Sequence, residues 1–125
     1  MEQNLIYKEE CFSIIGCCIE VHKYLGKGFN EILYKDALEY EFKKNNIIFE
    51  REKEFKITYK DIILPHNYFA DFIIENKIIL EIKAVESLNS SHIKQTINYL
   101  AASKLKLGIL VNFGEDSLKY KRIVL

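Results

Sequence analysis

The chain contains Tyr68-Phe69-Ala70-Asp71-Phe72-Ile73-Ile74, then Glu75-Asn76-Lys77, then Ile78-Ile79-Leu80-Glu81-Ile82-Lys83, and this stretch decides the fold. Segments rich in Ile and Phe are typical of strands, and the polar segment between them is a three-residue turn. With the turn centred on Asn76, Asp71 lies directly across from Glu81. Side chains alternate along a strand, so Glu81 and Lys83 point to one face. The predicted hairpin therefore brings two carboxylates and one amine to one patch of sheet.

This charged patch admits two interpretations. Neighbouring carboxylates repel each other unless a cation lies between them, and hard oxygen ligands suit Mg²⁺ or Mn²⁺. In the first interpretation, Asp71, Glu81 and the backbone carbonyl of Ile82 hold one or two divalent ions, and Lys83 orients or deprotonates a water. In the second, Glu81 and Lys83 form a surface ion pair worth well under about 1 kcal/mol. The spacing alone does not choose between them.

Length and composition predict a single domain over residues 1–125. The 125 residues, 49% of them apolar, suffice for one hydrophobic core and are too few for two. The 18 basic and 18 acidic residues cancel, so attraction to nucleic acid must come from local patches.

No stretch approaches the roughly 20 apolar residues that cross a bilayer, and Met1-Glu2-Gln3-Asn4 lacks the basic start of a signal peptide. We therefore expect a cytoplasmic protein with no membrane partner.

The three cysteines crowd into one helical segment and lack the spacing of a zinc site. We expect Cys11, Cys17 and Cys18 to be reduced thiols in the core.

Hydrophobic periodicity predicts two helices, a series of strands, and a third helix between the last strands. The last strands include an apolar run that is typical of a central strand buried on both faces. This order predicts an α/β sandwich, a mixed sheet with helices on its faces. Helices are expected over about 7–25, 30–44 and 90–104, and strands over 47–50, 54–59, 62–64, the hairpin, 108–113 and 117–125, with Pro65 in a loop before the hairpin.

Two motifs resemble a known family. Asp71 with Glu81-Ile82-Lys83 is similar to the PD-(D/E)XK nuclease signature. Gly28-Phe29-Asn30-Glu31-Ile32-Leu33-Tyr34 resembles the motif that names the GxxExxY proteins, a small branch of that superfamily. Similarity to the branch extends over nearly the whole chain, through residues 15–22, 81–85, 95–100 and 108–114.

The chain departs from the family pattern at three positions. Ala70 stands in place of proline, Phe69 in place of a basic residue, and Lys27 in place of proline. None of these departures touches the three central charged residues.

The resemblance implies a restriction-endonuclease-like three-layer sandwich, with a central mixed sheet flanked by helices, and a phosphodiesterase that uses Mg²⁺ or Mn²⁺. It implies that Asp71 and Glu81 are catalytic metal ligands and that Lys83 is the catalytic amine. Gln95 would be the polar group that faces the site from the third helix. Glu31 corresponds to an acidic residue that completes metal binding in many members.

Other residues have weaker claims to the site. His92, Gln95 and Tyr99 share one face of the third helix, which agrees with the implied role of Gln95, and we expect His92 and Tyr99 at the rim. Tyr34 is expected to pack in the core. Glu20 is expected to be a solvated charge, and His22 a partly buried polar residue.

The expected function is hydrolysis of phosphodiester bonds in nucleic acid, with DNA favoured over RNA, by an endo- or exonuclease. The alternative is a non-catalytic module that binds nucleic acid or protein on a nuclease fold, which the neutral charge and small size favour. One domain carries one site and cuts one strand, so cleavage of a duplex would need a homodimer.

Overall fold

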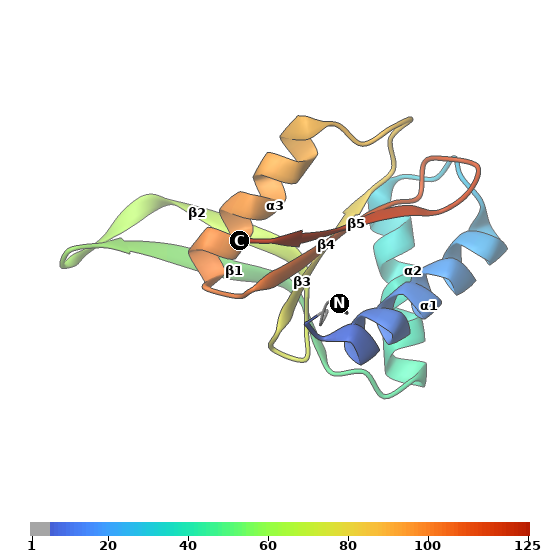
Figure 1. The fold of residues 1–125 in the computed structure, drawn as a ribbon, viewed down its shortest axis with the longest axis horizontal. Helices are drawn as coiled ribbons and strands as arrows, with labels where there is room; N and C mark the ends of the chain where they lie inside the picture. The colour runs from blue at the N-terminus through green and yellow to red at the C-terminus, as the bar shows by residue number, and fades with distance from the viewer. Residues whose placement is uncertain (1–5) are drawn as a thin grey trace, which may run out of the picture.

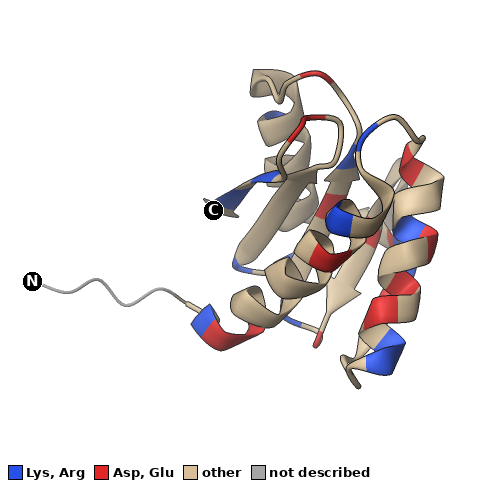
Figure 2. Cartoon of the chain, turned by 90° about the vertical axis from the view of Figure 1, so that its right-hand side faces the viewer, with Lys and Arg blue, Asp and Glu red and all other residues tan. Residues whose placement is uncertain are grey.

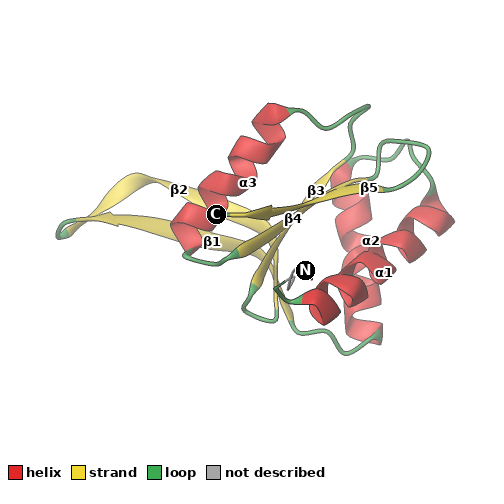
Figure 3. Ribbon diagram, viewed as in Figure 1, coloured by secondary structure: helices red, strands yellow, loops and turns green. Residues whose placement is uncertain are grey.

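A computed structural model of the chain describes residues 6–125 and forms three layers (Figure 3). The helices are α1 (Lys8–Leu25), α2 (Glu31–Lys44) and α3 (Ser90–Ser103). The strands are β1 (Phe49–Tyr59), β2 (Ile62–Ile74), β3 (Ile78–Lys83), β4 (Leu107–Asn112) and β5 (Lys119–Val124).

The strands form one mixed sheet in the order β1-β2-β3-β4-β5. β3 and β4 are parallel and are joined through α3, whereas the other neighbouring pairs are antiparallel. In Figure 1, α1 and α2 lie on one side of the sheet and α3 on the other, and the β1–β2 hairpin projects beyond the remaining strands. The predicted mixed sheet flanked by helices is confirmed.

Two apolar clusters fill the spaces between the layers. The larger joins α1 and α2 to one face of the sheet, and the smaller joins α3 to the opposite face. Every residue of β4 is buried, which confirms the prediction of a central strand. The three cysteines are free and buried, as predicted. Arg122 on β5 donates hydrogen bonds to Cys11 Sγ at 2.9 Å and to the Ile6 carbonyl at 3.0 Å, joining the last strand to the start of the first helix.

The loop between α1 and α2 is held by Tyr34. Its hydroxyl donates to the Gly26 carbonyl at 2.6 Å and accepts from the Phe29 N–H at 3.3 Å. Its fully buried ring stacks on Phe113, with ring centroids 4.6 Å apart. The expected core position of Tyr34 is confirmed. Asn30 caps α2, and its side chain accepts a hydrogen bond from the Leu33 N–H.

The start of α3 differs from the expectation for its polar face. Asn89 is the N-cap, and the His92 ring accepts a hydrogen bond from the Asn89 N–H, so His92 belongs to a capping box. Tyr99 is buried, with its ring edge-on to Tyr68. The expected rim position of Tyr99 is therefore wrong, because the residue packs in the apolar cluster between α3 and the sheet.

The early strands are longer than the sequence pattern predicts. Residues expected to form three short strands instead form β1 and the first part of β2, and Pro65 lies inside β2. The β1–β2 register shifts between Lys56 and Thr58, so Pro65 has no ladder partner. Proline lacks an N–H to donate and is tolerated at such irregularities, so the strand continues through it.

None of the helices among residues 6–125 is long and apolar enough to cross a membrane.

Candidate active site

The strand that carries Asp71 is irregular at that residue. Residues two apart on a regular strand share a face, but Phe72 packs with the α1–α2 cluster and Ala70 with the α3 cluster. Glu52, at the matching place on β1, has φ 56°, which is sparsely populated for a residue other than glycine. The strand is therefore irregular at Asp71, whose carboxylate is directed toward the Ile82 N–H of β3.

Asp71 and Glu81 are joined by reciprocal hydrogen bonds. The Asp71 N–H donates to Glu81 Oε2 at 2.8 Å, and the Ile82 N–H donates to Asp71 Oδ2 at 2.8 Å. Regular β2–β3 pairing runs from Ile74↔Ile78 to Phe72↔Leu80, so the next position places Asp71 opposite Glu81. The carboxylates replace ladder hydrogen bonds where the pairing ends. The hairpin register predicted from Asn76 is thus confirmed.

Burial dominates the electrostatics of Glu81. Only 3% of the residue is exposed. Burial, followed by the negative charge of Asp71, raises the pKa of the Glu81 carboxyl to about 9. Among residues 6–125, Glu81 forms no ion pair with Lys83. The interpretation of these two residues as a surface ion pair is wrong.

Lys35 on α2 supplies the cation beside Asp71. Its Nζ lies 3.1 Å from Asp71 Oδ1 and 2.5 Å from Glu52 Oε1. The side chain of Lys35 is 13% exposed and that of Asp71 16%. Burial acts to lower the pKa of Lys35, but the hydrogen bonds and charges of Glu52 and Asp71 outweigh burial and raise that pKa above its usual value. In this arrangement both Asp71 oxygens accept hydrogen bonds from the protein.

The other predicted site residues lie at different distances from this pair. Glu31 opens α2, and its Oε2 accepts from the Ala84 N–H at 3.4 Å, directly after the end of β3. Lys83 is partly buried at the end of β3, and its charge favours ionisation of Glu81. Gln95 is exposed on α3.

No group of three or more His, Cys, Asp or Glu residues among 6–125 is arranged to hold a metal ion. The structure therefore brings Asp71 and Glu81 together but does not join Glu31 to them.

Near the carboxylates, the sequence prediction does not include Lys35 and expects Tyr99 only at the rim. Lys35 follows Tyr34, the last residue of the glycine-to-tyrosine heptad. Its position near Asp71 depends on the direction in which α2 packs against the sheet. Tyr99 lies one turn beyond Gln95; burial and then the charges of Glu81 and Asp71 raise its pKa to about 12. The charges of the carboxylate pair therefore act on Tyr99, which lies on α3.

The fold and this pair together define a class of protein. A mixed sheet with helices on both faces, and acidic side chains from adjacent strands, is the arrangement of restriction-endonuclease-like proteins. The chain belongs to the PD-(D/E)XK nuclease superfamily, whose model matches residues 8–123. No curated protein matches the chain.

Two solved structures share the fold. One is the crystal structure of SSO0001, which is 27% identical, with a TM-score of 0.60, over 94% of this chain and 59% of that chain. The other is an alkaline exonuclease from Laribacter hongkongensis, which is 12% identical, with a TM-score of 0.57, over 98% of this chain and 72% of that chain. The chain thus spans 59% of the length of SSO0001.

Proposed function

We propose that the chain is a metal-dependent nuclease that hydrolyses phosphodiester bonds in DNA. The observation that carries this proposal is the reciprocal pairing of Asp71 and Glu81 at the end of β3, beside Lys83, in a PD-(D/E)XK chain. The glycine-to-tyrosine heptad at residues 28–34 supports placement in the GxxExxY branch. We also propose that residues 1–125 act as one nuclease-like domain.

The chemistry of the acidic pair fits one divalent ion. Asp71 and Glu81 offer hard carboxylate oxygens, and the backbone carbonyl of Ile82 lies between Glu81 and Lys83 in the sequence. Burial, and then the negative charge of Asp71, raises the pKa of Glu81, so a positive charge beside the pair would favour the ionised carboxylate. A bound Mg²⁺ or Mn²⁺ would supply that charge, acidify a water and offset charge on a phosphate. Glu31 is proposed as an additional ligand from α2.

The protein's own cations have separate roles in this proposal. Lys83 orients the attacking water or stabilises charge on the phosphate, because it ends β3 and forms no ion pair within the described residues. Lys35 is the resident counter-ion of Asp71, and we infer that a divalent ion displaces it toward Glu52. Gln95 is proposed to contact water or substrate from α3.

Two observations favour the alternative, a binding module without catalysis. The Lys35 ammonium already occupies an oxygen of Asp71, and Glu31 does not complete a group of three ligands among residues 6–125. A chain that retains this arrangement in every condition would be a module that binds nucleic acid or protein without cutting.

Cleavage assays with labelled single- and double-stranded DNA and RNA separate the two functions. Each substrate is incubated with the purified chain and Mg²⁺, Mn²⁺ or EDTA. We expect cleavage of DNA with either metal, none with EDTA, and loss of cleavage in Asp71→Asn, Glu81→Gln and Lys83→Ala. Lys44→Ala, which removes an exposed lysine at the end of α2, is the control and should cut normally.

Calorimetric titration with Mn²⁺ gives a second readout. The nuclease proposal requires binding by the wild type and loss of binding in Asp71→Asn. A wild type that binds DNA, does not bind Mn²⁺ and does not cleave would support the binding module instead.

A further inference from the structure

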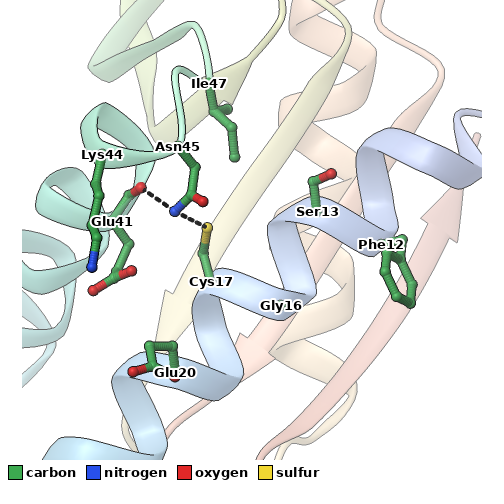
Figure 4. Close-up of a pocket in the computed structure, with 9 residues that line it drawn as sticks. All are labelled: Phe12, Ser13, Gly16, Cys17, Glu20, Glu41, Lys44, Asn45 and Ile47. Carbon is green, nitrogen blue, oxygen red and sulfur yellow. Dashed lines mark hydrogen bonds between the residues drawn. The ribbon is translucent and has the colours of Figure 1, made fainter.

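The outward face of α1 is exposed although several of its residues are apolar. Phe12 is 82% exposed and Ile19 52%. They border a hollow of about 340 Å³ between α1 and β5, which Ile15 and Tyr120 also line. A second hollow, of about 470 Å³, separates α1 from α2, and Figure 4 shows Gly16 beside it on α1. The helix therefore stands as a ridge with a hollow on each side.

Gly16 is the centre of this face. The buried residues of α1 lie on the opposite side of the helix, and a Cβ added at Gly16 would meet no atom within 4 Å. Glycine inside a helix costs roughly 0.5–1 kcal/mol relative to alanine. Nothing in the described chain requires this glycine, so its absent side chain leaves room for a neighbouring backbone.

Two exposed charges of opposite sign lie symmetrically about Gly16, and Glu20 is a further exposed charge beside the hollow between α1 and α2. Glu9, in the acidic first turn, and Lys23, in the basic last turn, each lie seven residues from Gly16. Both are exposed, and neither forms an ion pair among residues 6–125. In Figure 2, α1 crosses the front of the molecule with charged residues toward its ends and an uncharged stretch between them.

We propose that two copies of the chain associate through this face of α1, with the two helices antiparallel about a two-fold axis that passes by Gly16. A two-fold contact uses the same patch on both copies, so the patch must complement itself. Reversing the helix about Gly16 places Glu9 of one copy beside Lys23 of the other, and the same contact occurs twice. Glu9 and Lys23 are therefore complementary to each other across the proposed contact.

The apolar residues obey the same symmetry. Phe12 precedes Gly16 by four residues and Ile19 follows it by three, and both lie on the β5 side of the helix. In the antiparallel pair, Phe12 of one copy lies beside Ile19 of the other, where the hollow next to β5 can receive its ring. Two such contacts flank the close approach of backbones at Gly16.

The edge strand β5 is a less suitable surface for association of two copies. It carries Lys119, Lys121 and Arg122, so antiparallel pairing of two β5 strands would bring like charges together. The α1 face has both signs of charge, and we infer that self-association uses it instead.

Sedimentation equilibrium over about 1 to about 500 µM tests the contact, since a small patch gives a weak dimer. We expect the wild type to dimerise. Glu9→Lys and Lys23→Glu should each weaken the dimer roughly ten-fold, because two attractive pairs become repulsive. The double variant E9K/K23E should restore association. Lys94→Glu, a charge reversal on α3 across the sheet, is the control and should change nothing.

Gly16→Leu tests the close approach without endangering the fold. The added side chain meets open space in the single copy, so thermal unfolding at low concentration should show an equal or higher Tm, while dimerisation is lost. A chain that stays monomeric throughout would mean that another partner covers this face and would overturn the proposal. A dimer indifferent to Gly16→Leu, or not restored in E9K/K23E, would place the contact elsewhere and also overturn it.

Discussion

Lys35 is the residue whose replacement best tests the charge balance of the acidic pair. In Lys35→Met the Asp71 and Glu81 carboxylates lose their nearby cation, so we expect the metal-free protein to lose about 1–3 kcal/mol of unfolding free energy. Mn²⁺ no longer has to displace an ammonium, so its affinity should rise by about ten-fold. Urea unfolding in EDTA and Mn²⁺ calorimetry measure the two effects.

Lys43→Met is the matched control for Lys35. It removes an exposed pair with Glu39 on the same helix and should cost less than about 0.5 kcal/mol. Weaker Mn²⁺ binding in Lys35→Met would mean that Lys35 supports the loaded site rather than competing with the metal.

The raised pKa of Glu81 should make the stability of the protein depend on pH in the absence of metal. Its pKa is about 9 in the folded chain and near 4.5 in the unfolded chain, so the folded state keeps a proton that the unfolded state releases. Stability should therefore be greatest below about pH 4.5, as far as Glu81 is concerned, and fall as pH rises toward about 9. Glu81→Gln should remove this fall and exceed the wild type by at least about 1 kcal/mol near pH 8.

Urea unfolding in EDTA at about pH 5 and about pH 8 measures the Glu81 effect. Parallel pH profiles for wild type and Glu81→Gln would show that the carboxyl ionises normally in the folded protein.

At this scale, the sequence could predict the pair but not its surroundings. The pairing of Asp71 with Glu81 follows from the register of the hairpin, because a turn centred on Asn76 fixes which residues face each other. The contact of Lys35 depends on the packing of α2 against the sheet and on the irregular backbone at Glu52. Neither leaves a local pattern in the sequence. The same is true of Tyr99, whose polar hydroxyl suggested a rim position while its ring required burial.

Helix α2 and the loop before it give a prediction at the scale of elements. The Tyr34 hydroxyl joins Gly26 to Phe29, so Tyr34→Phe should cost about 1 kcal/mol of unfolding free energy while leaving the ring stacked on Phe113. Tyr40→Phe is the control, because Tyr40 is 63% exposed on the same helix. Equal urea midpoints for Tyr34→Phe and wild type would remove the proposed link between this tyrosine and the loop.

Helix boundaries were easier to predict than strand boundaries for a physical reason. Asn30 and Gly26 are local capping signals, and α1 and α2 begin or end where these residues stand. The extent of β1 and β2 depends on pairing between two distant segments, so a register shift can carry a strand through Pro65 despite its local preference.

Alanine substitutions at two glycines test how the layers pack across the whole molecule, and we expect them to change stability in opposite directions. A Cβ at Gly108 on β4 would lie 2.7 Å from Thr96 Cγ2 on α3, so Gly108→Ala should push α3 from the sheet and cost about 1–3 kcal/mol. Gly16→Ala meets open space and should stabilise the single copy by about 0.5–1 kcal/mol. Urea unfolding at low protein concentration compares them, and a neutral Gly108→Ala would show that α3 packs loosely.

The complete burial of β4 also constrains the order in which the protein can assemble during its synthesis. Ile109 and Val111 cover the face against which α1 and α2 pack, yet they leave the ribosome after both helices and three strands. Until then β2 and β3 cover only part of the apolar side of the early helices, and the part left exposed is a target for chaperones or for aggregation. Translation that pauses before β4 should therefore yield a protease-sensitive nascent chain, and release of the pause should convert it to a resistant one in a single step.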